Sequence, residues 1–430
     1  MRLVSIEHVT PGMRLGEPIR GARGQMLLNR GAILTQAYVE TLRSLEVSAI
    51  YVADPDTTDV EVPCSISAET RARLLKNLAQ VFDSLSDATE KIRSSTINLL
   101  EQSPQRDAML RDAAAMSGAS ESLYSVSKEV DLLLEEMGKQ EVLTGLNSIK
   151  TPEMYIFQHS IDVTIMSLVL ARRAQWERPR IRAFGIGCLL HDIGKVLIEP
   201  ALLNRAGTLT PEQFERLKGH TAIGYEMMRI IAPRLGSLAP QVAYQHHERQ
   251  DGSGYPRGLR GNSRLGENQP GTIHDFGALA AVADVYDAMT SHRPYRRALP
   301  TDQVVATIKA YAGDHLNAEA VRIFLSTVAP YPVCSPVVLV NGPHAEYSGV
   351  VVKVPPGDLA HPTVRLLCND RGERIEAFEV SLAIERDLNV RSAGGAAIQA
   401  HSLGSAPVTP QKPKSTYAIP AAVLAALKAG

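Results

Sequence analysis

Apolar and polar positions follow different periods along the chain and divide it into zones. Residues 1–60 mix short apolar runs with a helical stretch over 36–45 and a strand over 49–52, which predicts a small N-terminal α+β module. Residues 67–137 place apolar side chains three and four positions apart, a spacing typical of amphipathic helices. We therefore predict a helical connector over 61–137.

The helical spacing continues over 138–330, but polar side chains that can bind metals or take part in catalysis stand at helix ends and in loops. Beyond Pro330, β-branched runs are separated by turn residues, which predicts a small β-rich module over 331–392. Residues 393–430 are rich in Ala, Ser, Pro and Gly, which predicts a flexible tail with a short helical run over 418–428. The fold class expected is mainly α, flanked by the two small modules.

Composition narrows the functional classes. The 430 residues exceed what one core usually organises, and a net charge of -1 gives no sign of a surface for nucleic acid polymers. The four cysteines are scattered without a CxxC pair, which fits a reducing cytoplasm. We expect no signal peptide and no membrane helix, because the longest apolar helical stretch, 161–171, is far shorter than a span of roughly 20 residues.

Chemistry-bearing residues concentrate in the helical zone, where seven of the twelve histidines lie between His159 and His292. The segment CLLHDIGK interrupts an apolar helix with His191 and Asp192. A divalent cation would compensate a buried carboxylate there, and Lys195 could reach a substrate phosphate. An equally good interpretation in isolation is a helix C-terminus capped by Gly194.

Four further fragments are weaker evidence for a functional site when each is taken alone. His159 lies in a helical pattern, where a core or surface histidine is the commoner interpretation, and His220 is expected near the start of a helix. His246 and His247 run into a glycine-rich turn that packing does not explain. Asp284 is expected in an almost wholly apolar helix, where an unpaired carboxylate would be costly.

Together these residues resemble the HD-GYP domain of the HD phosphohydrolase superfamily. The resemblance is carried by HDIGK, HHERQDGSGYP and DAMTSHRPYR, which occur in the family's order, and it covers roughly residues 140–328. It implies that Asp192 bridges two metal ions, and that Lys195, Arg293 and Arg296 contact phosphates. The metal ligands that it implies are His159, His191, Asp192, His220, His246, His247 and Asp284.

The expected activity is metal-dependent hydrolysis of a phosphodiester. Seven nitrogen and oxygen ligands suit two ions, which can activate water without a separate protein base. Catalysis is assigned to Asp192 and Lys195. The resemblance implies cyclic di-GMP as the substrate, pGpG or GMP as the product, bacterial signalling as the setting, and iron, then manganese, as the metal. Two alternatives stay open: another nucleotide phosphohydrolase of the superfamily, or a non-catalytic scaffold that binds cyclic di-GMP or a diguanylate cyclase.

The chain departs from the family pattern at two places. Tyr155 stands where members with a third metal carry a glutamate, which favours a dinuclear site. The segment 261–277 is longer than usual, and its His274 and Asp275 are expected to belong to a polar loop rather than to an extra ligand set.

Two contacts with other protein chains are also expected. The loop Gly254, Tyr255 and Pro256 is assigned to partner recognition, with diguanylate cyclase domains as the partners that the resemblance suggests. A dimer through 61–137 is a further expectation.

Overall fold

The structure is a computed structural model, and all of its described residues belong to one unit of the chain, 1–398. The tail from 394 onward lies outside the described residues, so the prediction made for it stays a prediction. The described residues are 1–20, 26–45, 47, 49–62, 64–93, 103–138, 155–203, 209–291 and 298–393.

The N-terminal module combines two small antiparallel sheets with one helix. One sheet has the order β1-β5-β2, with Leu3 opposite Tyr51, and the other pairs β3 with β4. The helix begins after Thr35, whose side chain accepts a hydrogen bond from the backbone N–H of Tyr38. The elements are β1 (Arg2–Ser5), β2 (Arg14–Leu15), β3 (Ile19–Arg20), β4 (Met26–Leu28), α1 (Gln36–Ser44) and β5 (Ala49–Ala53).

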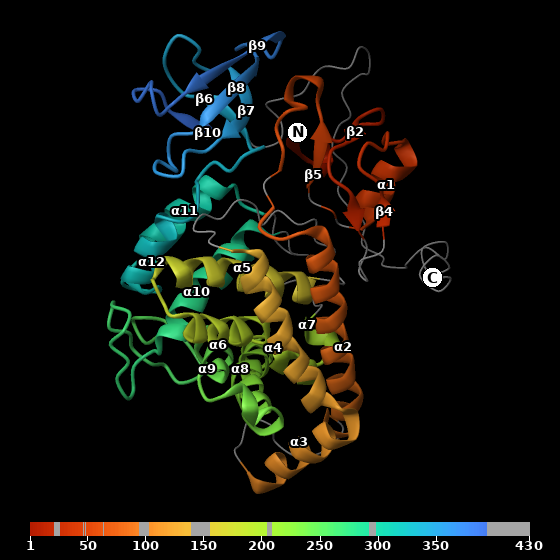
Figure 1. The fold of residues 1–430 in the computed structure, drawn as a ribbon, viewed down its shortest axis with the longest axis vertical. Coiled ribbons are helices and arrows are strands. Elements are labelled where there is room, and N and C mark those ends of the chain that lie inside the picture. Colours follow the sequence, from red (N-terminus) through yellow and green to blue (C-terminus); the bar gives the residue numbers. More distant parts are fainter. Residues whose placement is uncertain are drawn as a thin grey trace. The chain divides into compact units, whose positions relative to one another are not determined.

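Three helices follow, α2 (Ala68–Arg93), α3 (Pro104–Ser117) and α4 (Ala119–Glu136), and they share one hydrophobic core with the helices after them (Figure 1). Leu78 of α2 and Val130 of α4 are buried in this core, and both helices pack against later ones. The apolar faces of these amphipathic helices therefore pack against other helices of the same chain.

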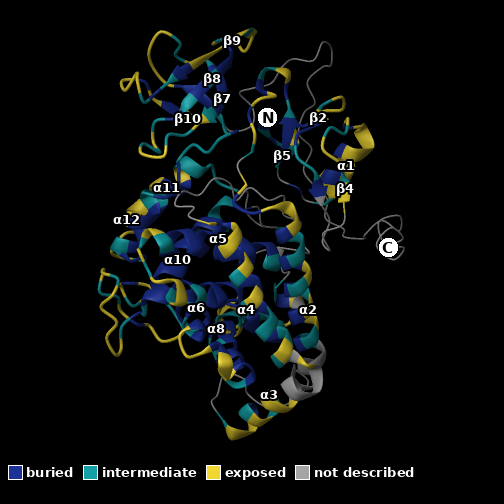
Figure 2. Ribbon diagram, viewed as in Figure 1, coloured by how far each residue is buried: buried dark blue, intermediate teal, exposed yellow. Residues whose placement is uncertain are grey.

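The largest part of the core lies between α5 and α12. Figure 2 shows α5 and α10 almost wholly buried, and the run of alanines in α10 lets the two helices pack closely. A short 3-10 helix, η4, packs against α8. The elements are α5 (Tyr155–Arg173), α6 (Arg178–Leu189), η4 (Ile193–Leu197), α7 (Pro200–Leu203), α8 (Pro211–Ile231), α9 (Ala239–Gln245), α10 (Asp275–Thr290), α11 (Thr301–Ala310) and α12 (Ala318–Leu325).

The C-terminal module is a five-stranded antiparallel sheet of order β10-β6-β7-β8-β9. Val351 lies opposite Val364, and both are buried in a small apolar core of their own. The strands are β6 (Pro336–Leu339), β7 (Ser348–Lys353), β8 (Thr363–Cys368), β9 (Arg374–Ser381) and β10 (Val390–Ser392).

The predicted fold class is confirmed: helices dominate, and a small α+β module and a small β-rich module flank them. Among the described residues, no helix combines the length and the apolar character needed to cross a membrane.

Candidate metal centre

The seven predicted metal ligands come together from five places in the helical part of the chain. His159 lies on α5, His220 on α8 and Asp284 on α10. His191 and Asp192 occupy the turn between α6 and η4, and His246 and His247 follow the last residue of α9. Residues far apart in the sequence therefore meet at one site.

The turn that carries His191 and Asp192 is shaped by a close approach of two backbones. A Cβ atom on Gly194 would lie 2.0 Å from the carbonyl oxygen of His220 and 2.7 Å from the backbone nitrogen of Gly224, so a side chain there would collide with α8. The helix-cap interpretation of Gly194 is wrong, because α6 already ends at Leu189. Glycine is needed here for packing.

His220 lies in the middle of α8 and not near its start, which corrects the prediction. The helix begins at Thr210, where a capping box is formed with Gln213 and Pro211 takes the first helical position. These signals are present in the sequence as TPEQ, at residues 210–213.

Asp192 lies at the centre of the cluster. Its Oδ1 atom is 3.4 Å from Nε2 of His220, and its Oδ2 atom is 3.4 Å from Nε2 of His191 and 3.7 Å from Nε2 of His159. The carboxylate thus faces histidines from three separate elements.

Asp284 joins the cluster from the other side. Its Oδ1 atom is 3.2 Å from Nε2 of His159, and its Oδ2 atom is 3.8 Å from Nδ1 of His247. Donor atoms lie within 4.8 Å of one another in each of two metal-capable groups, which are His159 with His191 and Asp192, and His220 with His246 and His247.

Four imidazole rings are oriented by contacts at Nδ1. The Nδ1 atoms of His191, His220 and His246 contact the carbonyl oxygens of Cys188, Leu217 and Val242, at 2.7, 2.5 and 2.9 Å. Nδ1 of His159 is 2.7 Å from a carboxylate oxygen of Asp287. Because a carbonyl oxygen can only accept, each of the first three rings carries its proton on Nδ1, and the lone pair of Nε2 remains for a metal.

The donor set fits divalent metal ions. His191 Nε2 and Asp192 Oδ1 are buried and have no hydrogen-bond partner among the described residues, which is costly unless a cation satisfies them. The ligand atoms are nitrogen and oxygen. Burial raises the pKa of the Cys188 thiol, close in the chain, to about 12, so it supplies no thiolate.

Three of the histidines are held neutral. Burial, helped by the charge of Lys195, lowers the pKa of His220 to about 3. Burial also lowers the pKa of His247 to about 4, and burial together with the neighbouring His247 lowers that of His246. Neutral imidazole is the form that binds metal.

The net pKa shifts of Asp192 and His159 come from oppositely charged groups in close contact. Burial alone would raise the pKa of Asp192, but Lys195 and His191 outweigh it and hold the carboxyl well below its usual range. Burial would likewise lower the pKa of His159, but hydrogen bonds to Asp284 and Asp287 raise it to about 9. Without metal, the imidazole of His159 therefore carries a proton at neutral pH.

Lys195 marks the solvent side of the centre. Its Nζ atom is 2.5 Å from Oδ2 of Asp192, while its side chain is 21% exposed, compared with 1% for Asp192. His247 is also open to solvent, at 29%. Arg293 and Arg296 lie outside the described residues, as does the side chain of Tyr155, so the predictions made for them stay predictions.

The loop of Gly254, Tyr255 and Pro256 lies against the centre. The ring of Tyr255 is 4.8 Å from that of His247, centre to centre, and the Tyr255-Pro256 peptide bond is cis. Glu248 closes the loop, because its carboxylate accepts hydrogen bonds from the backbone N–H groups of Arg257 and Leu259, each 2.8 Å long. Sequence analysis missed this role of Glu248.

Sequence analysis also missed Asp287, although it belongs to the DAMTSHRPYR motif and follows Asp284 by one helical turn. In the long segment 261–277, His274 ends the polar loop as predicted, whereas Asp275 is already the first residue of α10. His274 caps α10 through the N–H of Phe276, and Asp275 accepts hydrogen bonds from Gly266 and Arg180.

Comparisons with known proteins find an HD domain in the part of the chain that holds this site. A family model described as an HD domain matches residues 139–320. The chain is 28% identical over 369 residues to a cyclic di-GMP phosphodiesterase of Pseudomonas aeruginosa, covering 84% of each chain. It is 27% identical over 329 residues to a cyclic di-GMP phosphodiesterase of Thermotoga maritima, covering 71% of this chain and 86% of the relative.

A third relative differs in its substrate. It is a 3'3'-cGAMP-specific phosphodiesterase of Vibrio cholerae, 27% identical over 252 residues, which cover 54% of this chain and 51% of the relative. Residues 139–320 of the chain match an HD domain, and the resemblance stated from the sequence is confirmed.

Proposed function

We propose that this chain hydrolyses cyclic di-GMP at a centre of two divalent metal ions. The observation that carries the proposal is the convergence of five histidines and two aspartates on one buried site, where His191 Nε2 and Asp192 Oδ1 have no hydrogen-bond partner among the described residues. Relatives named as cyclic di-GMP phosphodiesterases support the choice of substrate.

The two metal-capable groups would each hold one ion, with Asp192 between them and Asp284 beside His159 and His247. When bound, such ions polarise a phosphoryl oxygen and activate water near neutral pH. A nitrogen and oxygen donor set without thiolate suits iron or manganese, and we propose iron first and manganese second.

The chain's own residues position the substrate. Lys195 stands at the solvent side of the centre with three N–H donors on a flexible stem, so it can hold a phosphate that approaches Asp192. We assign the same role to Arg293 and Arg296, which follow α10 in the sequence. The planar guanidinium group of arginine grips phosphate oxygens through two hydrogen bonds.

The partner and cellular setting are parts of the same proposal. A diguanylate cyclase domain would supply the substrate and would dock on the loop around Pro256, whose side chain is exposed. The setting is a reducing cytoplasm, in keeping with four free cysteines. A dimer through 61–137 is the least supported part, because those apolar faces pack within the chain.

The test is turnover by the purified, metal-loaded chain, with products separated by chromatography and metal measured in the same sample. We expect conversion of cyclic di-GMP to pGpG or GMP at about two metal ions per chain, and loss of both metal and turnover in Asp192→Ala. A fully loaded chain that binds cyclic di-GMP without cleaving it would favour the scaffold alternative. A metal content near three per active chain would contradict the dinuclear site.

A further inference from the structure

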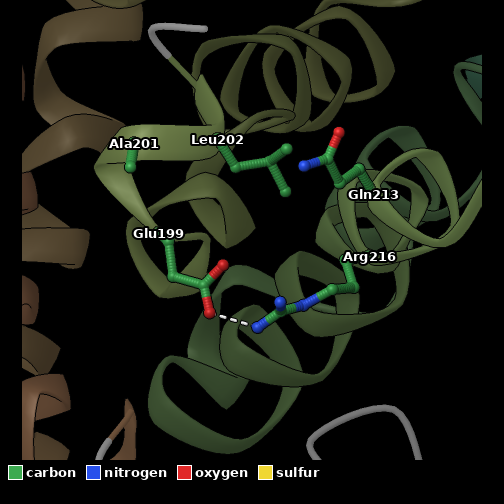
Figure 3. Close-up of a pocket in the computed structure, with 5 residues that line it drawn as sticks. All are labelled: Glu199, Ala201, Leu202, Gln213 and Arg216. Atoms are coloured by element: carbon green, nitrogen blue, oxygen red, sulfur yellow. Dashed lines mark hydrogen bonds and ion pairs between the residues drawn. The ribbon is translucent and has the colours of Figure 1, made fainter. Parts of the chain in front are cut away.

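A small hollow lies beside α8, between that helix and α7. Figure 3 shows its lining, in which Glu199 and Arg216 form an ion pair at one side and Leu202 lies across from Gln213. Its volume is about 220 Å³, less than the roughly 300 to 1,000 Å³ typical of sites for whole drug-sized ligands. The hollow therefore suits a flat fragment of a ligand rather than a complete dinucleotide.

The hollow and the metal centre draw residues from the same two parts of the chain. Arg216 precedes the ligand His220 by one turn of α8, so the two side chains share a helix face, with Cβ atoms about 5 to 6 Å apart. Glu199 follows Lys195 by four residues, and η4 touches α8 where Gly194 meets His220. A substrate phosphate held at Lys195 would bring an attached group toward Glu199 and Arg216.

We propose that this hollow binds a guanine base of the substrate and so selects guanine over adenine at that position. The inference rests on the proposed function, because it concerns the base attached to the phosphodiester that the metal centre would cleave. It assigns a specificity role to Glu199, Gln213 and Arg216, none of which belongs to the motifs that identify the family.

The lining matches the hydrogen-bonding edges of guanine. Arginine donates to the O6 and N7 acceptors of guanine, and a carboxylate accepts from its N–H donors. Adenine carries an amino donor where guanine has O6, so Arg216 would face a second donor, and the adenine ring nitrogen at N1 gives Glu199 no proton. Polar groups left unpaired in this way are what make such a site selective.

The other lining residues fit a base as well. The Oε1 atom of Gln213 accepts a hydrogen bond from the N–H of Thr210, and Figure 3 shows its amide nitrogen directed toward Leu202, across the hollow. Gln213 therefore offers a fixed donor. Ala201 and Leu202 supply an apolar surface for the face of the ring.

The ion pair is expected to contribute little to the stability of the fold. The side chains of Arg216 and Glu199 are 61% and 48% exposed, and exposed pairs contribute little to stability. Variants at these positions are expected to fold, so their kinetics report recognition. A matched control is the ion pair of Arg391 and Glu346 in the C-terminal module, 54% and 57% exposed.

The experiment compares the metal-loaded wild type with Arg216→Ala, Glu199→Gln and the control Arg391→Ala. The substrates are cyclic di-GMP, 3'3'-cGAMP, cyclic di-AMP and a chromogenic phosphodiester without bases. We expect Arg216→Ala to lower kcat/KM for cyclic di-GMP at least about tenfold, mainly through KM, and to leave the base-free ester unchanged. Glu199→Gln should narrow the preference for cyclic di-GMP over cyclic di-AMP, while Arg391→Ala matches the wild type.

Equal losses on cyclic di-GMP and on the base-free ester would overturn the inference, as would unchanged kinetics in both variants of the hollow. Either result leaves the proposed function standing, because the wild type still cleaves cyclic di-GMP. If the wild type cleaves none of it, the proposed function falls. Equilibrium binding of GMP and AMP then decides the inference: a preference for GMP that Arg216→Ala abolishes supports it, and equal binding of the two nucleotides overturns it.

Discussion

Asp287 lies with a carboxylate oxygen 2.7 Å from Nδ1 of His159, on the side of the ring opposite Asp192 and Asp284. Both residues are buried, so the contact is strong and specific. A carboxylate behind a ligand histidine fixes the ring and raises the basicity of its other nitrogen. Asp287 is therefore a positioning residue of the metal centre.

The first prediction tests this role with Asp287→Asn. The amide keeps the size of the side chain but loses its charge, and metal affinity should fall about 10- to 100-fold. The measurement is a competition titration with a chelator on the full chain. Ser291→Ala is the control, because it removes a 3.3 Å hydrogen bond to the same carboxylate and leaves His159 in contact with Asp287. Affinity in Asp287→Asn equal to that of the control would contradict the role.

The second prediction concerns protons released when metal binds. The pKa of His159 is raised to about 9, so below that pH the ring must lose a proton before it can act as a ligand. His220, His246 and His247 have lowered pKa values and contribute no proton at pH 8. Calorimetry at pH 8 in buffers of different ionisation enthalpy should give a larger proton release for the wild type than for Asp287→Asn.

The sign of this effect is fixed by the direction of the shift. A group whose pKa is raised holds its proton up to higher pH, so the difference between wild type and Asp287→Asn should shrink as pH rises through about 9. A difference in proton release that grows above pH 9 would show that His159 is not the source of the released proton.

The sequence alone identified the histidines and aspartates that the structure brings together, because HD and HH each place two of them side by side in the chain. The spacing of apolar residues likewise predicted α1, β5 and the strands β6 to β9 of the C-terminal module, but not β10. The sequence could not indicate the role of Asp287, because its contact with His159 forms only when α10 packs against α5. Glu248 was missed for a similar reason: its partners are backbone N–H groups of a folded loop.

The helical connector shows another limit of periodicity. The spacing over 67–137 predicts amphipathic helices but does not say what covers their apolar faces. The structure places Leu78 and Val130 in the same core as α5 and α10, and Arg71 of α2 forms an ion pair of 2.7 Å with the buried Asp162 of α5. That pairing also explains how a carboxylate is tolerated inside an apolar helix.

The third prediction separates the roles of Asp192 and Lys195. Asp192→Ala removes the carboxylate that faces three histidines, so metal content should fall to background. Lys195→Ala should keep its metal and lose turnover, because the ammonium group holds phosphate at the solvent side of the centre. Metal analysis and turnover on the same preparations distinguish the two. Loss of metal in Lys195→Ala would mean that the 2.5 Å ion pair with Asp192 is structural.

The last prediction concerns the backbone contact that holds the metal-binding turn against α8. In Gly194→Ala the new methyl group would meet the carbonyl oxygen of His220 at 2.0 Å, and neither backbone can rotate away as a flexible side chain would. The two segments must separate, which should lower the free energy of unfolding by about 1 to 3 kcal/mol. Because His191, Asp192 and His220 sit on the separated segments, metal affinity should fall as well.

Gly357→Ala is the control, since a Cβ atom there meets nothing within 4 Å. Denaturant unfolding of the metal-free chain measures the first effect and metal titration the second, and a Gly194→Ala chain that matches Gly357→Ala in both would show that the close approach is not required.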